Sequence, residues 1–525
     1  RTGVRARARN VIVAVDGAAA RTARATRVVR VAAGALAAGM LATVAIAPPA
    51  ANAAPIRPSN SEQLGGQRLV WGACPGVDDA RLRCTTVRVP LDHARPTNGR
   101  SITLTVSRLS TADPALRRGV LFTAGGGPGG AGVPEPLYLS SILDPSVLAR
   151  YDIVGFDMRF VERSTPISCG QPQEEPGGYW ARTATYQSFA QTVREAQAYA
   201  RDCARHAGWA LPYATTAQAA RDMDVIRAAL GERKISFLAG SYAAMLGSTY
   251  RALFPHRVDR FVLDSPINHE RIWRRYDLER LPAFEENYAA FAAYVADNSG
   301  TYGLGSTAAE VTRTLSQAFA RAAVEPIVIG DHAWTASELG TMAVVATYFD
   351  YLWPVVALDL AAILAGSPPP IPLDLYPAPL PGTPGVPPDN HTAVNMAFRC
   401  GDNAWPRDLA TYRRDLATYS VRHPVFGPTI ANLNPCAFWP VARDNRVPLA
   451  DDQAPAALVV AATHDASVPL PNSVAVARAN AGSRLVTVDR RVHVPFVGGQ
   501  GDDCLTGAVT DFLVTGRLPA RDLAC

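Results

Sequence analysis

The stretch 235–247 places Ser241 where an apolar, β-type run gives way to a helical pattern. A serine on such a strand-to-helix turn can act as a nucleophile, and small residues two before and two after it let the backbone segments approach closely. Here those positions are Ala239 and Ala243 instead of the usual glycines, which keeps them small but adds a methyl group at each contact. The pattern predicts a nucleophilic serine, with an ordinary buried serine in a strand-turn-helix as the alternative.

A serine nucleophile needs a base that takes its proton and an acid that orients the base. Asp465 follows an apolar run at 457–462, and His493 lies in the loop after a second run at 484–488. The carboxyl ends of strands in open α/β sheets collect functional groups, and the chain order Ser, Asp, His is one of the known orders of this triad. We therefore predict Ser241, Asp465 and His493 as catalytic residues.

Each of these positions has an alternative role. Asp465 could be a helix N-cap or a turn former, and His493 an ordinary surface histidine. His464 also follows a core strand, but it adjoins Asp465 directly and is poorly placed to bridge that acid to Ser241. His493 is therefore the preferred base.

A glycine-rich loop at 124–132 follows the apolar run 120–123. Glycines there let backbone N–H groups approach a developing oxyanion, so we predict an oxyanion hole formed by the amides of Gly127 and Tyr242, the residue after the nucleophile. A phosphate-binding loop is the competing interpretation. The loop lacks the Lys-Ser/Thr ending of that motif, and Pro128 removes a donor, so we expect no nucleotide and no other cofactor.

The elements that must hold these residues alternate between strands and helices. Two antiparallel strands, at 86–90 and 101–106, are followed by short, continuous apolar runs at 120–123, 151–156, 235–240, 260–264 and 457–461, with a helical pattern at 216–230. Continuous apolar runs are typical of strands that are buried on both faces of a mostly parallel sheet. This order predicts the α/β class with a doubly wound sheet.

The alternation breaks between residues 265 and 455. This interval contains amphipathic helical patterns at 281–295 and 308–323 and a proline-rich stretch at 367–390, which cannot be regular helix. An insertion of this length between core strands predicts a mainly helical cap domain, because a structureless loop of that size would be very unusual. We therefore divide the chain into core parts at 54–264 and 456–525 and a cap at 265–455.

Residues 1–53 have the composition of a secretory signal: arginines, then an Ala-rich apolar run, then the small-x-small sequence Ala51-Asn52-Ala53. Since the chain lacks an initiator Met, its first residues are compatible with a position upstream of the true start. A permanent membrane anchor is the weaker interpretation, because Pro48 and Pro49 end a run that is short for a spanning helix. The formal charge of +5 is concentrated in this segment, so no basic patch for nucleic acid remains.

Eight cysteines in an exported chain suggest four disulfides, for which 105 connectivities exist. Sequence proximity favours four local pairs, and no metal-ligand spacing is present, so a zinc site is not expected. The favoured pairs are Cys74 with Cys84, Cys169 with Cys203, Cys400 with Cys436, and Cys504 with Cys525.

Several motifs in order resemble one known family. They are the glycine loop at 126–130, Gly155-Phe156-Asp157-Met158-Arg159 followed by 163–166, the block 222–264 around Ser241, Cys400-Gly401-Asp402, and the C-terminal part from His493 to Cys525. Together they resemble the secreted tripeptidyl aminopeptidase and prolyl aminopeptidase-like branch of the α/β hydrolases, the S33 peptidases exported by actinobacteria. The resemblance covers about residues 71–525 and implies an α/β-hydrolase fold with a cap that restricts entry.

The resemblance also implies that short peptides are removed from free N-termini by the triad. A cap carboxylate would then hold the α-ammonium of the substrate, with Asp402 as the first candidate, Glu285 or Glu286 after it, and a solvated helix or loop charge as the alternative for each. The chain departs from the family pattern where Met158, Phe160 and Glu162 replace a proline and two glycines, which puts the peptide specificity in question.

Three hypotheses follow. The first is a secreted, extracellular serine exopeptidase that acts as a monomer on a peptide or small acyl substrate, without nucleic acid, metal or a stable membrane anchor. The second is an esterase, lactonase or amidase that uses the same triad on a secondary metabolite. The third is a non-catalytic binding protein that has kept the fold.

Overall fold

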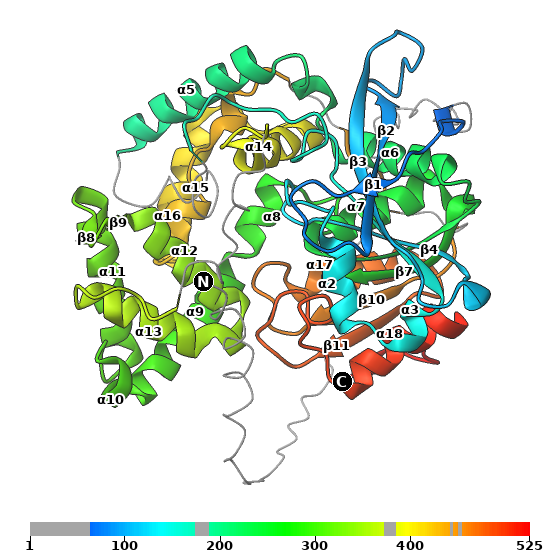
Figure 1. Cartoon of the computed structure of the whole chain (residues 1–525). Coiled ribbons are helices and arrows are strands. Elements are labelled where there is room, and N and C mark those ends of the chain that lie inside the picture. Colours follow the sequence, from blue (N-terminus) through cyan, green and yellow to red (C-terminus); the bar gives the residue numbers. More distant parts are fainter. Residues whose placement is uncertain (1–63, 174–187, 372–384, 442–444, 450–453) are drawn as a thin grey trace, which may run out of the picture. The chain divides into compact units, whose positions relative to one another are not determined.

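The computed structural model describes residues 64–173, 188–371, 385–441, 445–449 and 454–525 (Figure 1). The predicted signal segment 1–53 and part of the proline-rich stretch lie outside the described residues. None of the described helices is long and apolar enough to cross a membrane.

Ten strands among the described residues form one large mixed sheet. From β5 to β12 in spatial order all neighbouring strands are parallel, whereas β1, β2 and β3 pair antiparallel at one edge. β5 is buried along its whole length and β2 alternates between buried and exposed residues, as expected of a central and a one-sided strand. The predicted α/β class is confirmed. In spatial order the strands are β1 (Gly72–Ala73), β2 (Leu82–Pro90), β3 (Ser101–Leu109), β5 (Tyr151–Phe156), β4 (Gly119–Ala124), β6 (Ile235–Gly240), β7 (Val258–Asp264), β10 (Leu458–Ala462), β11 (Arg484–Val488) and β12 (Leu523–Ala524).

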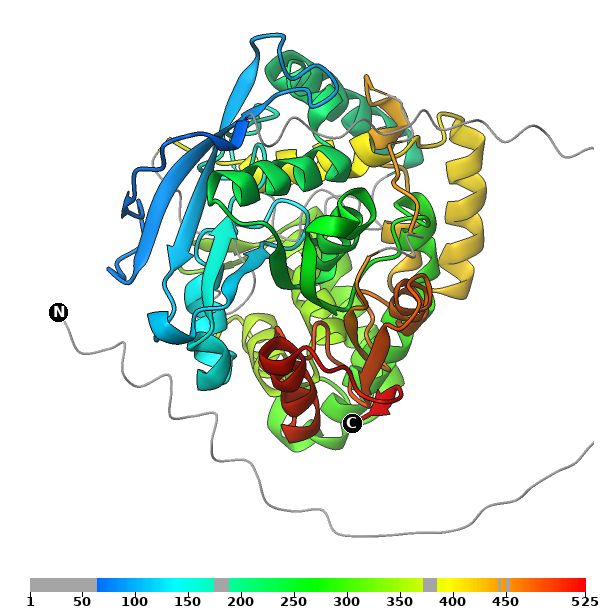
Figure 2. The same cartoon turned by 90° about the vertical axis from the view of Figure 1, so that its right-hand side faces the viewer.

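Helices cover both faces of this sheet (Figure 2). α6 (Thr216–Ala229), α7 (Ser241–Leu253) and α17 (Leu470–Arg478) contribute to the main hydrophobic cluster with Phe122 and Phe237 of the sheet. α2 (Glu135–Ile142), α3 (Pro145–Leu148) and α18 (Asp503–Thr515) form a second cluster with Leu121 and Leu238. Because adjacent residues of β4 and β6 point to opposite faces, these two clusters lie on the two sides of a doubly wound sheet.

The part between β7 and β10, residues 265–455, is called the inserted segment here. Its elements are α8 (Arg274–Glu279), α9 (Leu281–Asp297), α10 (Ser299–Tyr302), α11 (Ala308–Val324), the hairpin β8 (Ile327–Ile329) and β9 (His332–Trp334), α12 (Ala336–Tyr348), the 3-10 turn η5 (Asp350–Leu352), α13 (Trp353–Leu364), α14 (Asn390–Asp402), α15 (Leu409–Arg422), α16 (Gly427–Ile430) and η7 (Pro435–Phe438). Helices α9 to α13 lie together in Figure 1. They share a hydrophobic cluster of their own, whose members include Phe291 and Leu339.

Helices from both parts of the chain join the inserted segment to the rest of the protein, and α14 and α5 (Phe189–Ala207) are the clearest examples. α14 packs Val394 and Phe398 into the main cluster of the sheet and not into the cluster of α9 to α13. Conversely α5, which precedes the inserted segment in the chain, packs Ala196 against Tyr412 of α15 and Leu433. The inserted segment is therefore anchored to the core through buried apolar contacts in both directions.

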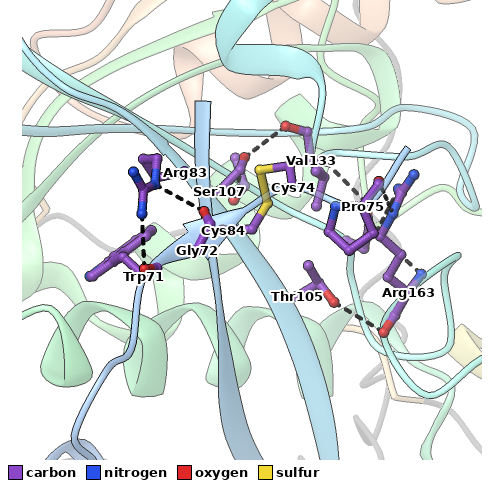
Figure 3. The surroundings of a disulfide bond; sticks show 12 residues. Trp71, Gly72, Cys74, Pro75, Arg83, Cys84, Thr105, Ser107, Val133 and Arg163 are labelled. Carbon is purple, nitrogen blue, oxygen red and sulfur yellow. Dashed lines mark hydrogen bonds and ion pairs between the residues drawn. A yellow bond between two sulfur atoms is a disulfide. The ribbon is translucent and has the colours of Figure 1, made fainter. Parts of the chain in front are cut away.

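Four disulfides join the sequence-local pairs Cys74–Cys84, Cys169–Cys203, Cys400–Cys436 and Cys504–Cys525, the same pairs that the sequence favours. The first of them fixes a loop whose Pro75 carbonyl accepts a hydrogen bond of 3.1 Å from Nε of Arg163 (Figure 3). Thr105 in β3 donates to the carbonyl of Arg163. The N-terminal edge of the sheet thus supports the loop that follows β5.

Candidate active site

Ser241 lies at the junction of β6 and α7 in a strained backbone conformation. Its φ of 59° is in the left-handed region, which a residue with a side chain rarely adopts. Ala239 and Ala243 on either side are buried. A Cβ added to Gly240 would lie 2.6 Å from Cγ1 of Val494, so the residue after His493 packs directly against the turn that carries Ser241. This is the backbone arrangement of a nucleophile elbow.

His493 and Asp465 form a buried hydrogen-bonded pair. Nδ1 of His493 lies 2.8 Å from Oδ2 of Asp465, and the side chains are 9% and 0% exposed. The other carboxylate oxygen of Asp465 accepts from the amide of Val468 at 2.8 Å. With Nδ1 held by the acid, Nε2 is the ring nitrogen available to exchange a proton with a nucleophile.

The segment around His493 is paired with the inserted segment on one side. The amide of His493 donates to the carbonyl of Tyr348 at 2.8 Å, and Phe349 forms an antiparallel bridge with Val492. The amide of Asp350 donates to the carbonyl of Arg491 at 3.0 Å. Backbone pairing therefore fixes the chain at the base to the end of α12 in the inserted segment.

The glycine loop passes beside Ser241. A Cβ on Gly126 would lie 4.0 Å from Cβ of Ser241, and Gly127 has a φ of 112°, a conformation that glycine adopts without strain. The loop is closed by a 2.9 Å hydrogen bond from the amide of Gly130 to the carbonyl of Gly126. Tyr242 is the second residue of α7, where the helix leaves its backbone N–H groups without a helical partner. Such amides can bind a negatively charged oxygen.

Asp157, directly after β5, holds the end of this loop. Its Oδ1 accepts from the amides of Gly132 and Val133 at 2.9 and 3.0 Å, and Oδ2 accepts from the amide of Arg163 at 3.3 Å. Burial raises the pKa of Asp157 to about 6. The sequence offered this aspartate only as part of a family motif.

The inserted segment reaches the same loop through α14. Nδ2 of Asn395 donates to the carbonyl of Pro128 at 2.9 Å. A Cβ on Gly129 would lie 2.8 Å from the carbonyl oxygen of His391, and one on Gly127 would lie 3.7 Å from Nε2 of that histidine. His391 is therefore a residue at the glycine loop that strand-end reasoning misses, because it lies at the start of an inserted helix.

The structure places the three predicted ammonium-binding carboxylates in different surroundings. Asp402 is buried, accepts from the amide and hydroxyl of Thr216 and from Nε1 of Trp273, and has a pKa that burial raises to about 6. Through Thr216, whose hydroxyl lies 2.8 Å from that of Tyr242, it supports the residue after the nucleophile. These contacts favour a structural role for Asp402.

Glu285 and Glu286 are neighbours on α9 with different partners. Oε1 of Glu285 accepts from the amides of Val425 and Phe426, both at 2.9 Å, and burial raises its pKa. Oε1 of Glu286 lies 2.9 Å from both Nδ1 of His464 and Nη1 of Arg491, and its side chain is 56% exposed. Glu286 is thus the most accessible of the three predicted carboxylates. It contacts the segment that carries Asp465 and the segment that carries His493.

The substitutions that set this chain apart from the family pattern have a local explanation. Phe160 and Glu162 have φ values of 72° and 44°, the region that glycine favours. Asn390 at the start of α14 accepts from the amide of Glu162 at 2.8 Å and donates to the carbonyl of Phe160 at 2.9 Å. The ring of Phe160 is buried and meets Trp209 edge-on at 5.7 Å between centroids, so its added bulk lies in the hydrophobic cluster.

Comparisons with known proteins identify two family models and several similar sequences. A family model described as "alpha/beta hydrolase fold" matches residues 120–339, and one described as "TAP-like protein" matches residues 423–525. Tripeptidyl aminopeptidase of Streptomyces lividans is 35% identical over 463 residues, covering 85% of this chain and 83% of that protein.

Two mycobacterial proteins are also similar. Serine protease Hip1 of Mycobacterium tuberculosis is 27% identical over 508 residues, covering 88% of this chain and 91% of that protein. Carboxylesterase B of the same species is 29% identical over 487 residues, covering 87% and 89%. Among solved structures, proline iminopeptidase of Mycobacterium smegmatis is 13% identical with a TM-score of 0.37, covering 82% of this chain and 97% of that one.

Proposed function

Since the chain belongs to the tripeptidyl aminopeptidase-like branch of the α/β hydrolases and is a serine hydrolase, we propose that it is an exopeptidase that releases short peptides from free N-termini. The observation that carries the proposal is the buried His493–Asp465 pair, whose segment packs against the strained turn at Ser241. The peptidase relatives support the choice of a peptide bond as the target.

In the proposed mechanism, Oγ of Ser241 attacks the carbonyl carbon of the scissile peptide bond while Nε2 of His493 takes its proton. Asp465 keeps the imidazole oriented through Nδ1 and stabilises the imidazolium. The amides of Gly127 and Tyr242 bind the oxyanion of the tetrahedral intermediate. His493 then protonates the leaving amine, and an acyl-enzyme on Ser241 remains.

The second half of the reaction repeats these roles with water. His493 takes a proton from water, the resulting hydroxide attacks the acyl carbon, and the proton returns to Oγ of Ser241 as the peptide leaves. Apart from the substrate and water, every proposed step uses groups of the chain itself.

Among the three predicted carboxylates, Glu286 is the one we propose for the α-ammonium of the substrate. Oε1 of Glu286 is already bound by His464 and Arg491, but its side chain is 56% exposed and can exchange a solvent contact for a charge-assisted hydrogen bond. Asp402 is buried with both oxygens bound, and Oε1 of Glu285 is held by two backbone amides.

A fluorophosphonate probe and a peptide panel test the proposal together. We expect the probe to label the wild-type protein and not Ser241→Ala, and tripeptide substrates to be cleaved when their N-terminus is free and not when it is acetylated. Equal cleavage of both forms would remove the exopeptidase assignment, while absent labelling would indicate a non-catalytic binding protein.

Ester hydrolysis is the second candidate, because one similar protein is named Carboxylesterase B. The triad chemistry is the same, since an acyl-enzyme forms from either an ester or an amide. A higher kcat/KM for unactivated esters than for tripeptides would favour this alternative.

We further propose that the protein is exported and acts outside the cell as a monomer. Four disulfides are consistent with an oxidising compartment.

A further inference from the structure

Asp264 is a buried carboxyl group at the centre of the candidate active site that the mechanism above does not use. It is the last residue of β7, which lies between β6, leading to Ser241, and β10, leading to Asp465. Its side chain is 0% exposed. It therefore occupies the same carboxyl edge of the sheet as the nucleophile and the acid.

Asp264 and its neighbour bind the backbone that follows His493. Oδ2 of Asp264 accepts from the amides of Phe496 and Val497 at 2.9 and 2.7 Å. Oγ of Ser265 accepts from the amide of Val494 at 3.2 Å. Since Pro495 has no N–H, this pair takes every backbone donor from residue 494 to residue 497.

The two carboxyl oxygens of Asp264 differ in their hydrogen bonding. Oδ1 of Asp264 is buried without a hydrogen-bond partner among the described residues. Burial, reinforced by the charge of Asp465, raises the pKa of Asp264 to about 8, against the lowering effect of its hydrogen bonds with the amides of Val497 and Phe496 and with the side chain of Ser265. Near neutral pH the carboxyl group of Asp264 would thus be protonated.

The charged and titratable groups around Asp264 are few. Asp465 faces it from the loop after β10 and His493 lies in the segment that it binds. From α2, Tyr138 donates to the carbonyl of Val497 at 2.6 Å, and the field of Asp264 contributes to the raised pKa of that tyrosine. The adjacent end of β6 offers only Ala239 and Gly240. No cation in this set balances a second negative charge beside Asp465.

We propose that Asp264 is a positioning residue that holds the backbone after His493 as an uncharged carboxylic acid. Among the groups named above, Asp465 is then the one carboxylate charge acting on that histidine. This role rests on the proposed triad. Ionisation of Asp264 would place a like charge next to Asp465 and disturb the Asp465–His493 pair, so turnover would decline as Asp264 loses its proton.

Two substitutions separate the parts of the proposal. Asp264→Asn keeps an oxygen for both amides and cannot ionise, whereas Asp264→Ala leaves the amides unpaired. For a p-nitrophenyl ester and a free tripeptide, we expect Asp264→Asn to keep kcat at pH 7 within about threefold and to lose the alkaline decline. Asp264→Ala should lower kcat by about tenfold or more and should change KM far less.

Asp389 provides a matched control. Its Oδ2 likewise accepts two backbone amides, those of Cys169 and Gln171, and its Oδ1 is likewise buried without a partner among the residues that can be described. Asp389→Asn should change the thermal midpoint and leave the shape of the pH profile as in the wild type. If Asp264→Ala fails to fold, the comparison of Asp264→Asn with Asp389→Asn still decides the matter.

Three results would overturn the proposal. The first is a folded Asp264→Ala variant with the kcat of the wild type, and the second is an Asp264→Asn variant whose kcat is as low as that of Asp264→Ala. The third is an Asp264→Asn variant whose turnover declines at alkaline pH as in the wild type. Ser241→Ala distinguishes this failure from failure of the proposed function. If one of those three results is found and Ser241→Ala has lost its turnover, only the role of Asp264 is overturned. If Ser241→Ala keeps full turnover, the triad is overturned, and the role of Asp264 with it.

Discussion

Asp157→Ala tests whether a buried carboxylate holds the glycine loop in place from the end of β5, two strands away from the β6 strand that leads to Ser241. The substitution removes the acceptor of three amides, of which those of Gly132 and Val133 are buried and that of Arg163 is half-buried. An unpaired buried donor costs about 1–3 kcal/mol, so two cost about 2–6 kcal/mol.

Part of this cost is offset by the loss of the charge. The pKa of Asp157 is raised to about 6 in the folded protein, so at pH 7 its ionised form destabilises the fold by about 3 kcal/mol at 1.36 kcal/mol per pKa unit. The net change in the free energy of unfolding is therefore expected to lie between a gain of about 1 kcal/mol and a loss of about 3 kcal/mol. Turnover should fall more steeply, by about 10²–10³-fold in kcat, which is the effect of losing one oxyanion donor.

The assay combines kcat on a p-nitrophenyl ester with chemical denaturation at pH 7. Asp157→Asn, which keeps an oxygen for the two buried amides, should stay within about tenfold of wild-type kcat. Asp152, at the opposite end of β5, accepts from the amide of Thr111 and from Nε of Arg117, so Asp152→Ala should alter stability and not turnover. A folded Asp157→Ala with wild-type kcat would refute the reasoning.

Three further predictions concern other parts of the molecule. Replacing Cys74 and Cys84 by serine should lower the free energy of unfolding by about 3 kcal/mol, since the disulfide closes a loop with a sequence separation of 10; unchanged denaturation curves would contradict this. Glu286→Gln should raise KM for free tripeptides roughly tenfold with kcat retained, while Glu285→Gln should alter only stability; equal KM values in all three proteins would argue against the anchor. Between about pH 4 and about pH 8, the free energy of unfolding of the wild type should fall relative to that of Asp264→Asn, by up to about 1.4 kcal/mol per pH unit. The reason is that folded Asp264 keeps a proton that the unfolded chain releases. Parallel stability curves of the two proteins would speak against this prediction.

The sequence could predict the main features of the fold because each depends on local patterns. Continuous apolar runs gave the central strands, and residues just past their ends gave Ser241, Asp465 and His493. The contact between Asp465 and His493 follows from that rule, since the ends of neighbouring parallel strands meet at one edge of the sheet.

Other features depend on contacts between distant segments, which no local pattern encodes. Asp264 also ends a strand, but its significance comes from amides 232 and 233 residues further along the chain. Asp402 belongs to a recognisable motif, yet its partner Thr216 lies 186 residues away, so its burial could not be foreseen. The packing of α14 into the main cluster likewise depends on the tertiary structure.

The bridge between Phe349 and Val492 has a consequence for how such enzymes diversify. Inserted segments are often regarded as exchangeable modules that alter specificity without touching catalysis. Here the end of α12 supplies a hydrogen-bonded edge to the segment that carries His493, so a transplanted module would have to bring a matching edge strand with it. Recombination between relatives should therefore tolerate breakpoints within α10, α11 or the β8–β9 hairpin far better than breakpoints near residues 348–350.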